Sequence, residues 1–181
     1  YVFNLSAGTV TKNTTSYSFV ANTSAVLNLT DVGGLNFTRV NITTRNSFPA
    51  KISGLRHMGD RNPENSSRNL EQEIIGFWTI IPDDILVANL SENMSVTLFY
   101  GSGMLNGLRS EVFKLYYFDY KTSSWIVQSE TTPRNQLSIS FSTKNFGTYT
   151  LSNTPPPSTA AAGPVAEAPK AKKTIKTPYI G

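Results

Sequence analysis

The chain contains no cysteine and only one histidine, His57. The lack of cysteine excludes disulfide bonds and thiol chemistry. A single histidine cannot supply the histidine clusters that hold zinc. Long apolar runs are missing as well, since no stretch approaches the ~20 residues of a membrane-spanning helix. We therefore expect no membrane span, no metal site and no cofactor.

Charge is also scarce. Charged residues make up 15% of the 181 residues, against a usual share of about 25%. The net charge is +4, and residues 163–181 supply +3 of it through four lysines and one glutamate, which leaves +1 for the rest of the chain. A nucleic-acid-binding domain carries a basic patch on its folded part. We therefore expect no nucleic-acid partner.

Alternation of apolar and polar residues is what the chain has instead. In residues 136–141, Leu137, Ile139 and Phe141 share one face and two serines take the other, which is the period of a half-buried strand. Similar runs recur along the chain with turn residues between them. This succession predicts an all-β fold, an antiparallel Ig-like β-sandwich. For residues 112–151 we expect an antiparallel meander.

Four features depart from simple alternation. The pattern slips within residues 35–43, which predicts a β-bulge near Thr38 and Arg39. Residues 53–69 are long and polar, which indicates a loop. Two acidic residues open residues 83–90 and favour a helical turn there. Trp125 opens a strand directly after a turn, and we expect its ring to close one end of the core.

Nine Asn-x-Ser/Thr triplets, the acceptor motif for N-glycosylation, occur in the first 95 residues and none later. Random placement of the 16 asparagines and 41 serines and threonines would give about 3.6. The triplets begin at Asn4, Asn13, Asn22, Asn28, Asn36, Asn41, Asn65, Asn89 and Asn93. Several of these asparagines lie between apolar residues. In a strand such asparagines face water while their neighbours face the core.

We therefore expect covalent N-glycans on most of the nine asparagines. Glycosylation implies a secreted or cell-surface protein. The chain begins at Tyr1 rather than at methionine, as expected for a mature form whose signal peptide has been removed. The predicted localisation is extracellular or at the cell surface.

Residues 1–7 form an alternating segment at the N-terminus. Its apolar side carries Tyr1, Phe3, Leu5 and Ala7. We expect this strand to leave its own sandwich and complete the sheet of a second copy, because an added strand pairs with a sheet edge while alternate side chains fill pockets. Gly8 and the polar residues 9–15 are expected to act as a hinge or as a second short strand.

The composition changes after residue 151. Residues 152–170 are rich in proline and alanine and predict a semi-rigid linker. Residues 171–181 are basic and regain apolar side chains, so we predict a docking segment that contacts another subunit through Ile175, Tyr179 and Ile180. The predicted division is thus a donor strand over residues 1–10, a sandwich over 11–151, the linker and the docking segment.

One series of aromatic motifs suggests a family. It runs from an apolar strand ending in proline at residues 77–82 (FWTIIP) through LYYF at 115–118 and Trp125 to a closing FGTYTL at 146–151. Residues 76–151 thereby resemble a β domain of archaeal cell-surface proteins. The sequon-rich first 75 residues resemble archaeal extracellular filament subunits, which are β-sandwiches joined by donor strands. The resemblance implies a structural role in a homopolymer.

We therefore predict a structural subunit of a glycosylated extracellular filament or surface array, and not an enzyme. The alternative is an adhesin or carbohydrate-binding sandwich that uses Tyr116, Tyr117, Tyr120 and Trp125 as a stacking platform. The acidic residues show no spacing that marks a glycosidase pair.

A calcium site is a minor hypothesis. It would use Asp83 and Asp84 together with Glu71 and Glu73, because carboxylate oxygens are the preferred calcium ligands.

Overall fold

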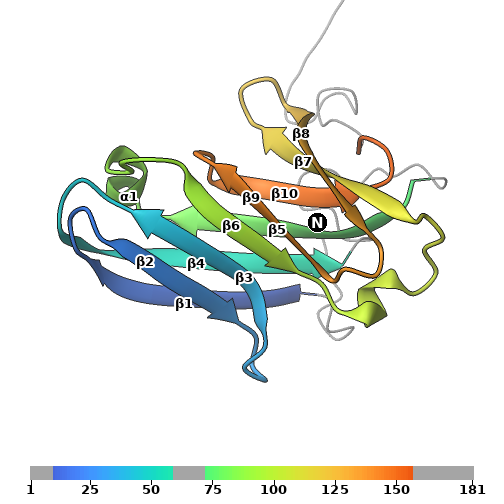
Figure 1. Cartoon of the computed structure of the whole chain (residues 1–181), viewed down its shortest axis with the longest axis horizontal. Coiled ribbons are helices and arrows are strands. Elements are labelled where there is room, and N and C mark those ends of the chain that lie inside the picture. Colours follow the sequence, from blue (N-terminus) through green and yellow to red (C-terminus); the bar gives the residue numbers. More distant parts are fainter. Residues whose placement is uncertain (1–9, 59–71, 157–181) are drawn as a thin grey trace, which may run out of the picture.

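The computed structural model describes residues 10–58 and 72–156, which form two antiparallel sheets packed face to face (Figure 1). Sheet A has the strand order β1-β4-β5-β10-β7-β8, and sheet B has the order β2-β3-β6-β9. The predicted antiparallel β-sandwich is confirmed, and its Ig-like character stays a prediction. The strands are β1 (Val10–Phe19), β2 (Ser24–Thr30), β3 (Asn36–Thr43), β4 (Phe48–Met58), β5 (Ile74–Pro82), β6 (Met94–Phe99), β7 (Val112–Asp119), β8 (Ser124–Pro133), β9 (Ser138–Thr143) and β10 (Gly147–Ser152).

The core lies between the two sheets and is built by the alternation seen in the sequence. In β2, Ala25, Leu27 and Leu29 are at most 3% exposed, while the residues between them are exposed. Trp78 of β5 is fully buried and belongs to the same cluster. Each sheet therefore buries its inner face on the other and leaves its outer face for other contacts.

Gly54 sets the spacing of the sheets at one point. A Cβ atom there would lie 2.5 Å from Cδ1 of Leu29 and 3.2 Å from Cε2 of Phe37. Since both contacts belong to sheet B, the missing side chain is what allows β4 to approach it this closely.

Strand β4 corrects the loop predicted over residues 53–69, as far as Met58. The strand pairs with β1 on one side and with β5 on the other. Its polar residues hid this position, because Gly54 and Arg56 occupy inward sites where the sequence pattern expects apolar side chains. Pairing on both sides satisfies the backbone, and this outweighs the weak strand propensity of the segment. The rest of that predicted loop lies outside the described residues.

The hinge expected over residues 9–15 is wrong from Val10 onward. Residues 10–19 pair with β4 along their whole length, from Val10 opposite His57 to Phe19 opposite Phe48. The second option, a short strand, was nearer, although the strand has ten residues. Its many hydroxyl side chains suit an edge strand, because the unpaired side of such a strand is in contact with water.

The predicted meander over residues 112–151 is also wrong. β7 and β8 form a hairpin in sheet A, β9 crosses to sheet B, and β10 returns to sheet A between β5 and β7. Alternation shows that a strand has one buried face. It does not show which of the two sheets the strand joins.

Two smaller predictions are confirmed. The pairing of β2 with β3 skips Phe37, since Leu29 lies opposite Thr38 and Thr30 lies opposite Asn36. This is the bulge predicted near Thr38 and Arg39, located one residue earlier at Phe37, and it explains why both Phe37 and Thr38 are buried. The helical turn expected over residues 83–90 is α1 (Asp84–Ala88).

Candidate functional site

The outer face of sheet B carries small uncharged side chains. Strand pairing places them in rows across the four strands, and one row contains Asn41, Ser95 and Ser142 with the exposed Val26 at its β2 end. A neighbouring row contains Thr97 and Ser140, whose hydroxyl oxygens lie 2.8 Å apart. Among the described residues facing outward here, Arg39 is the only charged one, and its guanidinium lies 5.2 Å from the centre of the Phe99 ring.

Three sequon asparagines lie on this face. Asn28 is exposed, and Asn36 and Asn41 are half-buried. The carboxamide oxygen of Asn28 accepts hydrogen bonds from Nε of Arg39 at 3.0 Å and from Nδ2 of Asn36 at 3.4 Å. The oxygen of Asn41 accepts from the hydroxyl of Ser24. N-glycans attach to the side-chain nitrogen, so Asn28 and Asn41 offer that atom while their oxygens are held.

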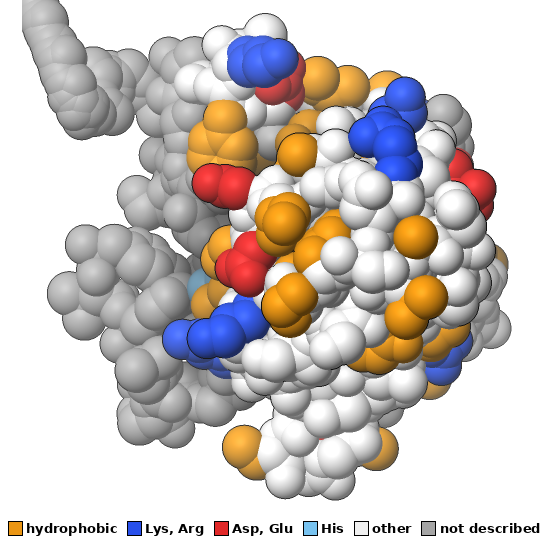
Figure 2. All heavy atoms as spheres, turned by 90° about the vertical axis from the view of Figure 1, so that its left-hand side faces the viewer, with side chains coloured by type: hydrophobic (Ala, Val, Ile, Leu, Met, Phe, Trp, Pro, Cys, Tyr) orange, Lys and Arg blue, Asp and Glu red, His pale blue; other side chains and the backbone are white. Residues whose placement is uncertain are grey.

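Three more sequon asparagines lie at the end of the sandwich that carries α1. Asn22 is exposed in the turn between β1 and β2, and Asn93 is exposed just before β6. Asn89 follows α1, where its Nδ2 donates to the Ile85 carbonyl at 2.8 Å and its oxygen accepts from Asn46 at 2.7 Å. Figure 2 looks onto this end and shows uncharged polar groups over much of it, with scattered hydrophobic and charged side chains.

The remaining sequons are placed differently. Asn13 of β1 is half-buried, and its Nδ2 donates to the carbonyl of Thr30 at 3.0 Å. Asn4 and Asn65 lie outside the described residues, as do the predicted subunit-contact residues Tyr1, Phe3, Leu5, Ala7, Ile175, Tyr179 and Ile180. The predictions for those residues remain predictions.

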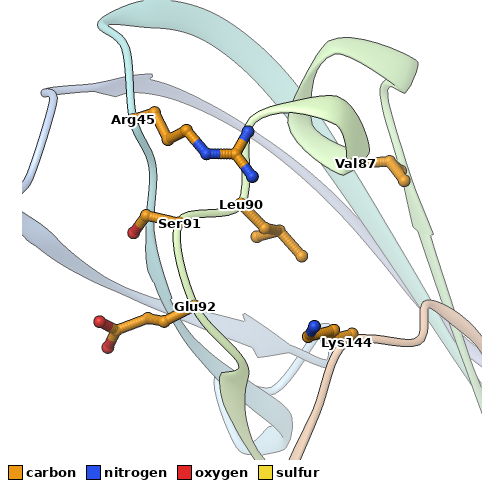
Figure 3. A pocket seen from close by; sticks show the side chains of 6 residues that line it. All are labelled: Arg45, Val87, Leu90, Ser91, Glu92 and Lys144. Atoms are coloured by element: carbon orange, nitrogen blue, oxygen red, sulfur yellow. The ribbon is translucent and has the colours of Figure 1, made fainter.

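A small pocket of about 220 Å³ lies at the α1 end (Figure 3). It is lined by Arg45, Val87, Leu90, Ser91, Glu92 and Lys144. The Arg45 side chain donates to the Ala88 carbonyl at 3.1 Å, and in Figure 3 the carboxylate of Glu92 points away from Lys144. Small-molecule sites usually have volumes of about 300–1,000 Å³ and convergent polar groups. This pocket has neither feature.

The outer face of sheet A carries an aromatic cluster. Phe77 and Phe118 are at most 2% exposed, and the Trp125 ring lies 5.9 Å from Phe77 and 5.1 Å from Phe118. The expectation that Trp125 closes the core between the sheets is therefore wrong. Pairing with Phe118 places it on the opposite face of sheet A.

The predicted stacking platform is split by the same geometry. Tyr116 is 4% exposed on the outer face, whereas Tyr117 faces the core, with its ring 5.0 Å from Tyr149. Tyr120 is 58% exposed and Trp125 is half-buried. The four side chains thus do not form one exposed surface.

His57 lies beside the aromatic cluster rather than in a loop, since it pairs with Phe77 and is 3% exposed. Burial lowers the pKa of His57 to about 4, so the imidazole is neutral near pH 7. The alternation pattern does not indicate this buried position, because the surrounding residues of β4 are largely polar.

A second pocket, of about 330 Å³, lies at the opposite end of the sandwich from α1. Arg56 points into it from β4, with Nη1 3.4 Å from the Phe99 carbonyl and its guanidinium 5.9 Å from the Phe37 ring centre. Burial lowers the pKa of Arg56, and the charge of Asp31 partly offsets that effect. Arg56 was not predicted as a site residue, because it occupies an inward position in β4, part of which was predicted to be a loop.

Strand β5 holds Glu73 apart from Asp83 and Asp84, three of the four acidic residues considered for calcium, while the fourth, Glu71, lies outside the described residues. Glu73 precedes the strand, where its Oε1 accepts from the backbone N–H of Arg109 and of Ser110. Asp83 follows it, where its Oδ2 accepts from the N–H of Lys51. Two ends of a nine-residue strand cannot share one cation, so the calcium hypothesis is wrong for these residues.

Within residues 10–58 and 72–156 no cluster of metal-ligating side chains occurs. No described helix has the length and apolarity to cross a membrane. No family model matches this chain, and no curated protein or solved structure matches it.

Proposed function

We propose that this chain is a structural, non-catalytic subunit of a glycosylated extracellular polymer whose copies are joined by exchange of the N-terminal strand. The observation that carries the proposal is the unequal distribution of sequons. All nine precede residue 95. Of the seven described, three lie on the outer face of sheet B and three at the α1 end. The β7–β10 half of the sandwich contains none.

This distribution suits a subunit with a coated side and a contact side. Glycans on exposed asparagines keep one surface hydrated and unable to pack against another protein. The half without sequons keeps its strand edges accessible, and an open edge pairs readily with an added strand. A head-to-tail exchange does not close on itself, so the product is an open fibre. In this scheme residues 152–170 act as a spacer and residues 171–181 as a second contact.

Glycosylation is tested by intact-mass analysis of the native protein and of two single-hydroxyl variants. Ser95→Ala destroys the sequon of Asn93, and Ser142→Ala removes the paired hydroxyl on the next strand without touching a sequon. We expect the first variant to lose the mass of one glycan and the second to keep the native mass. A native mass equal to that of the bare chain would refute the glycan coat.

Strand exchange is tested by electron microscopy of purified material. The double variant Phe3→Asp and Leu5→Asp removes the apolar side of residues 1–7. The control, Val2→Asp with Ser6→Asp, places the same charge on the polar side and also removes the sequon of Asn4. We expect filaments from the native chain and from the second variant, and aggregation-prone monomers from the first. Normal filaments from the first variant contradict exchange.

The second candidate function is glycan binding as an adhesin. The exposed ring of Tyr120 favours it, because aromatic faces stack on sugars and this ring, like that of Trp125, packs on Phe118. The burial of Tyr116 and the inward position of Tyr117 reduce the surface that stacking would use. Monomers that bind a glycan array and lose binding in Tyr120→Ala would support this function over the first.

A further inference from the structure

The two sheets are unequal in width. Sheet A has six strands and sheet B has four, so the inner face of sheet A extends beyond β9 at the side where β7 and β8 lie (Figure 1). Tyr149 of β10 packs against Phe141 of β9 at 4.9 Å between ring centres, which places β9 over β10. No described strand of sheet B lies beyond β9 to cover β7 and β8.

Burial along β8 reflects this uncovered strip. Thr132, near the turn to β9, is fully buried, whereas Ile126 near the other end is 42% exposed. Ile126 nevertheless faces inward, because it pairs with Tyr117, which packs on the core. An inward-facing isoleucine with this exposure indicates a place where the second layer is incomplete.

Among the described residues, the free edge of β9 carries the fewest features that protect a sheet edge. Natural sheets block their edges with charges, prolines, bulges or covering groups. β8 has a bulge, Glu130 and Pro133, β1 has Lys12, and β2 bears the sequon of Asn28. β9 has the sequence SISFST, with no charge, proline or sequon.

From these observations we infer that the free edge of β9, together with Tyr117 and Ile126, is the acceptor edge for residues 1–7 of a second copy. This assignment rests on the strand exchange proposed above. The added strand becomes the fifth strand of sheet B. Its side of Tyr1, Phe3, Leu5 and Ala7 faces inward and covers the exposed strip, and its backbone pairs with β9.

The polar side of the same strand fits the same place. Asn4 and Ser6 would face outward beside Ser140 and Ser142, which lie on the outer face of sheet B. The sequon of Asn4 then joins the face that already carries Asn28 and Asn41. Both sides of residues 1–7 therefore match the chemistry of the acceptor edge.

The donor must come from another copy because residues 1–7 are joined to β1 by too short a link. β1 lies three strand spacings from β10 and in the other sheet from β9. At about 4.8 Å per strand and 10 Å between sheets, the free edge of β9 is roughly 20 Å away. Residues 8 and 9 separate Ala7 from Val10, the first residue of β1. At ~3.3 Å per residue this link reaches about 10 Å, which is less than the distance to β9.

The test uses a synthetic peptide of the sequence YVFNLSA and the full chain carrying Phe3→Asp and Leu5→Asp, so that its own donor is disabled. Hydrogen exchange is measured with and without peptide. We expect amides of β9 that point away from β6 to exchange at least tenfold more slowly with peptide, while the edges of β1, β2 and β8 stay unchanged. Protection at another edge, or at none, overturns the assignment.

Two variants of the same chain provide a matched pair. Ile126→Asp and Val127→Asp alter adjacent residues of β8 with 42% and 52% exposure that face opposite sides of sheet A. We expect Ile126→Asp to weaken peptide binding at least tenfold and Val127→Asp to change it less than twofold, with both folded by circular dichroism. Equal binding by the two variants overturns the acceptor edge.

The failure of this inference differs from failure of the proposed function. If native filaments form and Phe3→Asp with Leu5→Asp abolishes them, strand exchange stands, and protection away from β9 refutes only the acceptor edge. If the native chain forms no polymer and the peptide protects no edge, both are refuted.

Discussion

Replacing Tyr149 with phenylalanine removes one hydroxyl from the junction between β9 and β10. The ring is fully buried, and its hydroxyl donates to the Asn145 carbonyl at 2.5 Å and lies 3.0 Å from Oγ1 of Thr143. The variant keeps the ring contacts with Phe141 and Tyr117. It therefore isolates the polar part of the junction.

The expected loss follows from the partners left behind. Removing one member of a buried hydrogen-bonded pair costs about 1–3 kcal/mol. Thr143 still accepts from the N–H of Asn145 at 3.0 Å, so we expect a decrease of about 2 kcal/mol in the free energy of unfolding. This corresponds to roughly a 30-fold change in the unfolding equilibrium and to about 6 °C in Tm for a domain of this size.

The assay is urea unfolding of the native chain, of Tyr149→Phe and of Tyr17→Phe as a control. Tyr17 lies at the edge of sheet A with 39% exposure, and its variant should stay within about 0.5 kcal/mol of the native value. A loss below 0.5 kcal/mol for Tyr149→Phe would mean that these hydrogen bonds contribute nothing net, and the reasoning fails.

Alkaline pH provides a second readout for the same residue. Burial, the largest cause, raises the pKa of Tyr149 above its ordinary value of 10. Above pH 10 the unfolded chain loses this proton and the folded chain keeps it, so native stability falls as the pH rises. Tyr149→Phe lacks this loss. The stability difference between the two chains should therefore shrink above pH 10, and a constant difference contradicts the assignment.

Three further perturbations follow. Gly54→Ala places a methyl group against Leu29 and should cost about 1–3 kcal/mol, whereas Gly103→Ala meets nothing within 4 Å and should be neutral; equal effects contradict the close approach of the sheets. Burial lowers the pKa of His57 to about 4, so stability present above pH 6.5 should be lost as the pH falls from 6.5 toward 4. His57→Leu should reduce this loss, and a pH profile of unfolding that is the same in the variant and the native chain refutes the role of His57. Trp125→Ala uncovers Phe77 and Phe118 and should cost about 2 kcal/mol, as measured by urea unfolding, and a neutral result would mean that the outer cluster adds no stability.

The sequence predicted those parts of the fold where the alternation is undisturbed. Leu27 and Leu29 identified the buried side of β2, and with it the outward position of Asn28. The bulge in β3 was visible because a slip of one residue moves apolar side chains to the opposite face. These are local signals, and each depends on a few consecutive residues.

The missing parts depend on contacts between distant residues. The sequence did not predict all of β4, because the residue types at two of its inward positions depend on tertiary contacts. Gly54 is needed where Leu29 approaches the backbone, and Arg56 lies at the open end of the sandwich. The assignment of β9 to sheet B depends on its pairing with β6, which leaves no mark in the pattern of β9. For the same reason, the exposure of Ile126 could not be predicted without knowing which strand is the last one in sheet B.

The hydrogen bonding of the sequons was equally inaccessible from the sequence. The pattern treats Asn13 and Asn28 alike, although the nitrogen of Asn13 donates to a carbonyl and the oxygen of Asn28 accepts. This difference depends on neighbouring strands. We therefore expect Asn28 to be the more completely modified residue if glycans are added after folding.

The hydroxyl and amide rows on the outer face of sheet B have a consequence for the medium in which this protein can work. Interactions between exposed charges weaken as dissolved ions accumulate, over a screening length of about 8 Å at 0.15 M and 3 Å at 1 M. Neutral hydroxyls carry no such dependence, and Arg39 is the only charge among the described residues of this face. The hydration of this face should therefore be nearly the same in dilute water and in brine. On a face built from lysine and glutamate, the interactions between charges would weaken in brine.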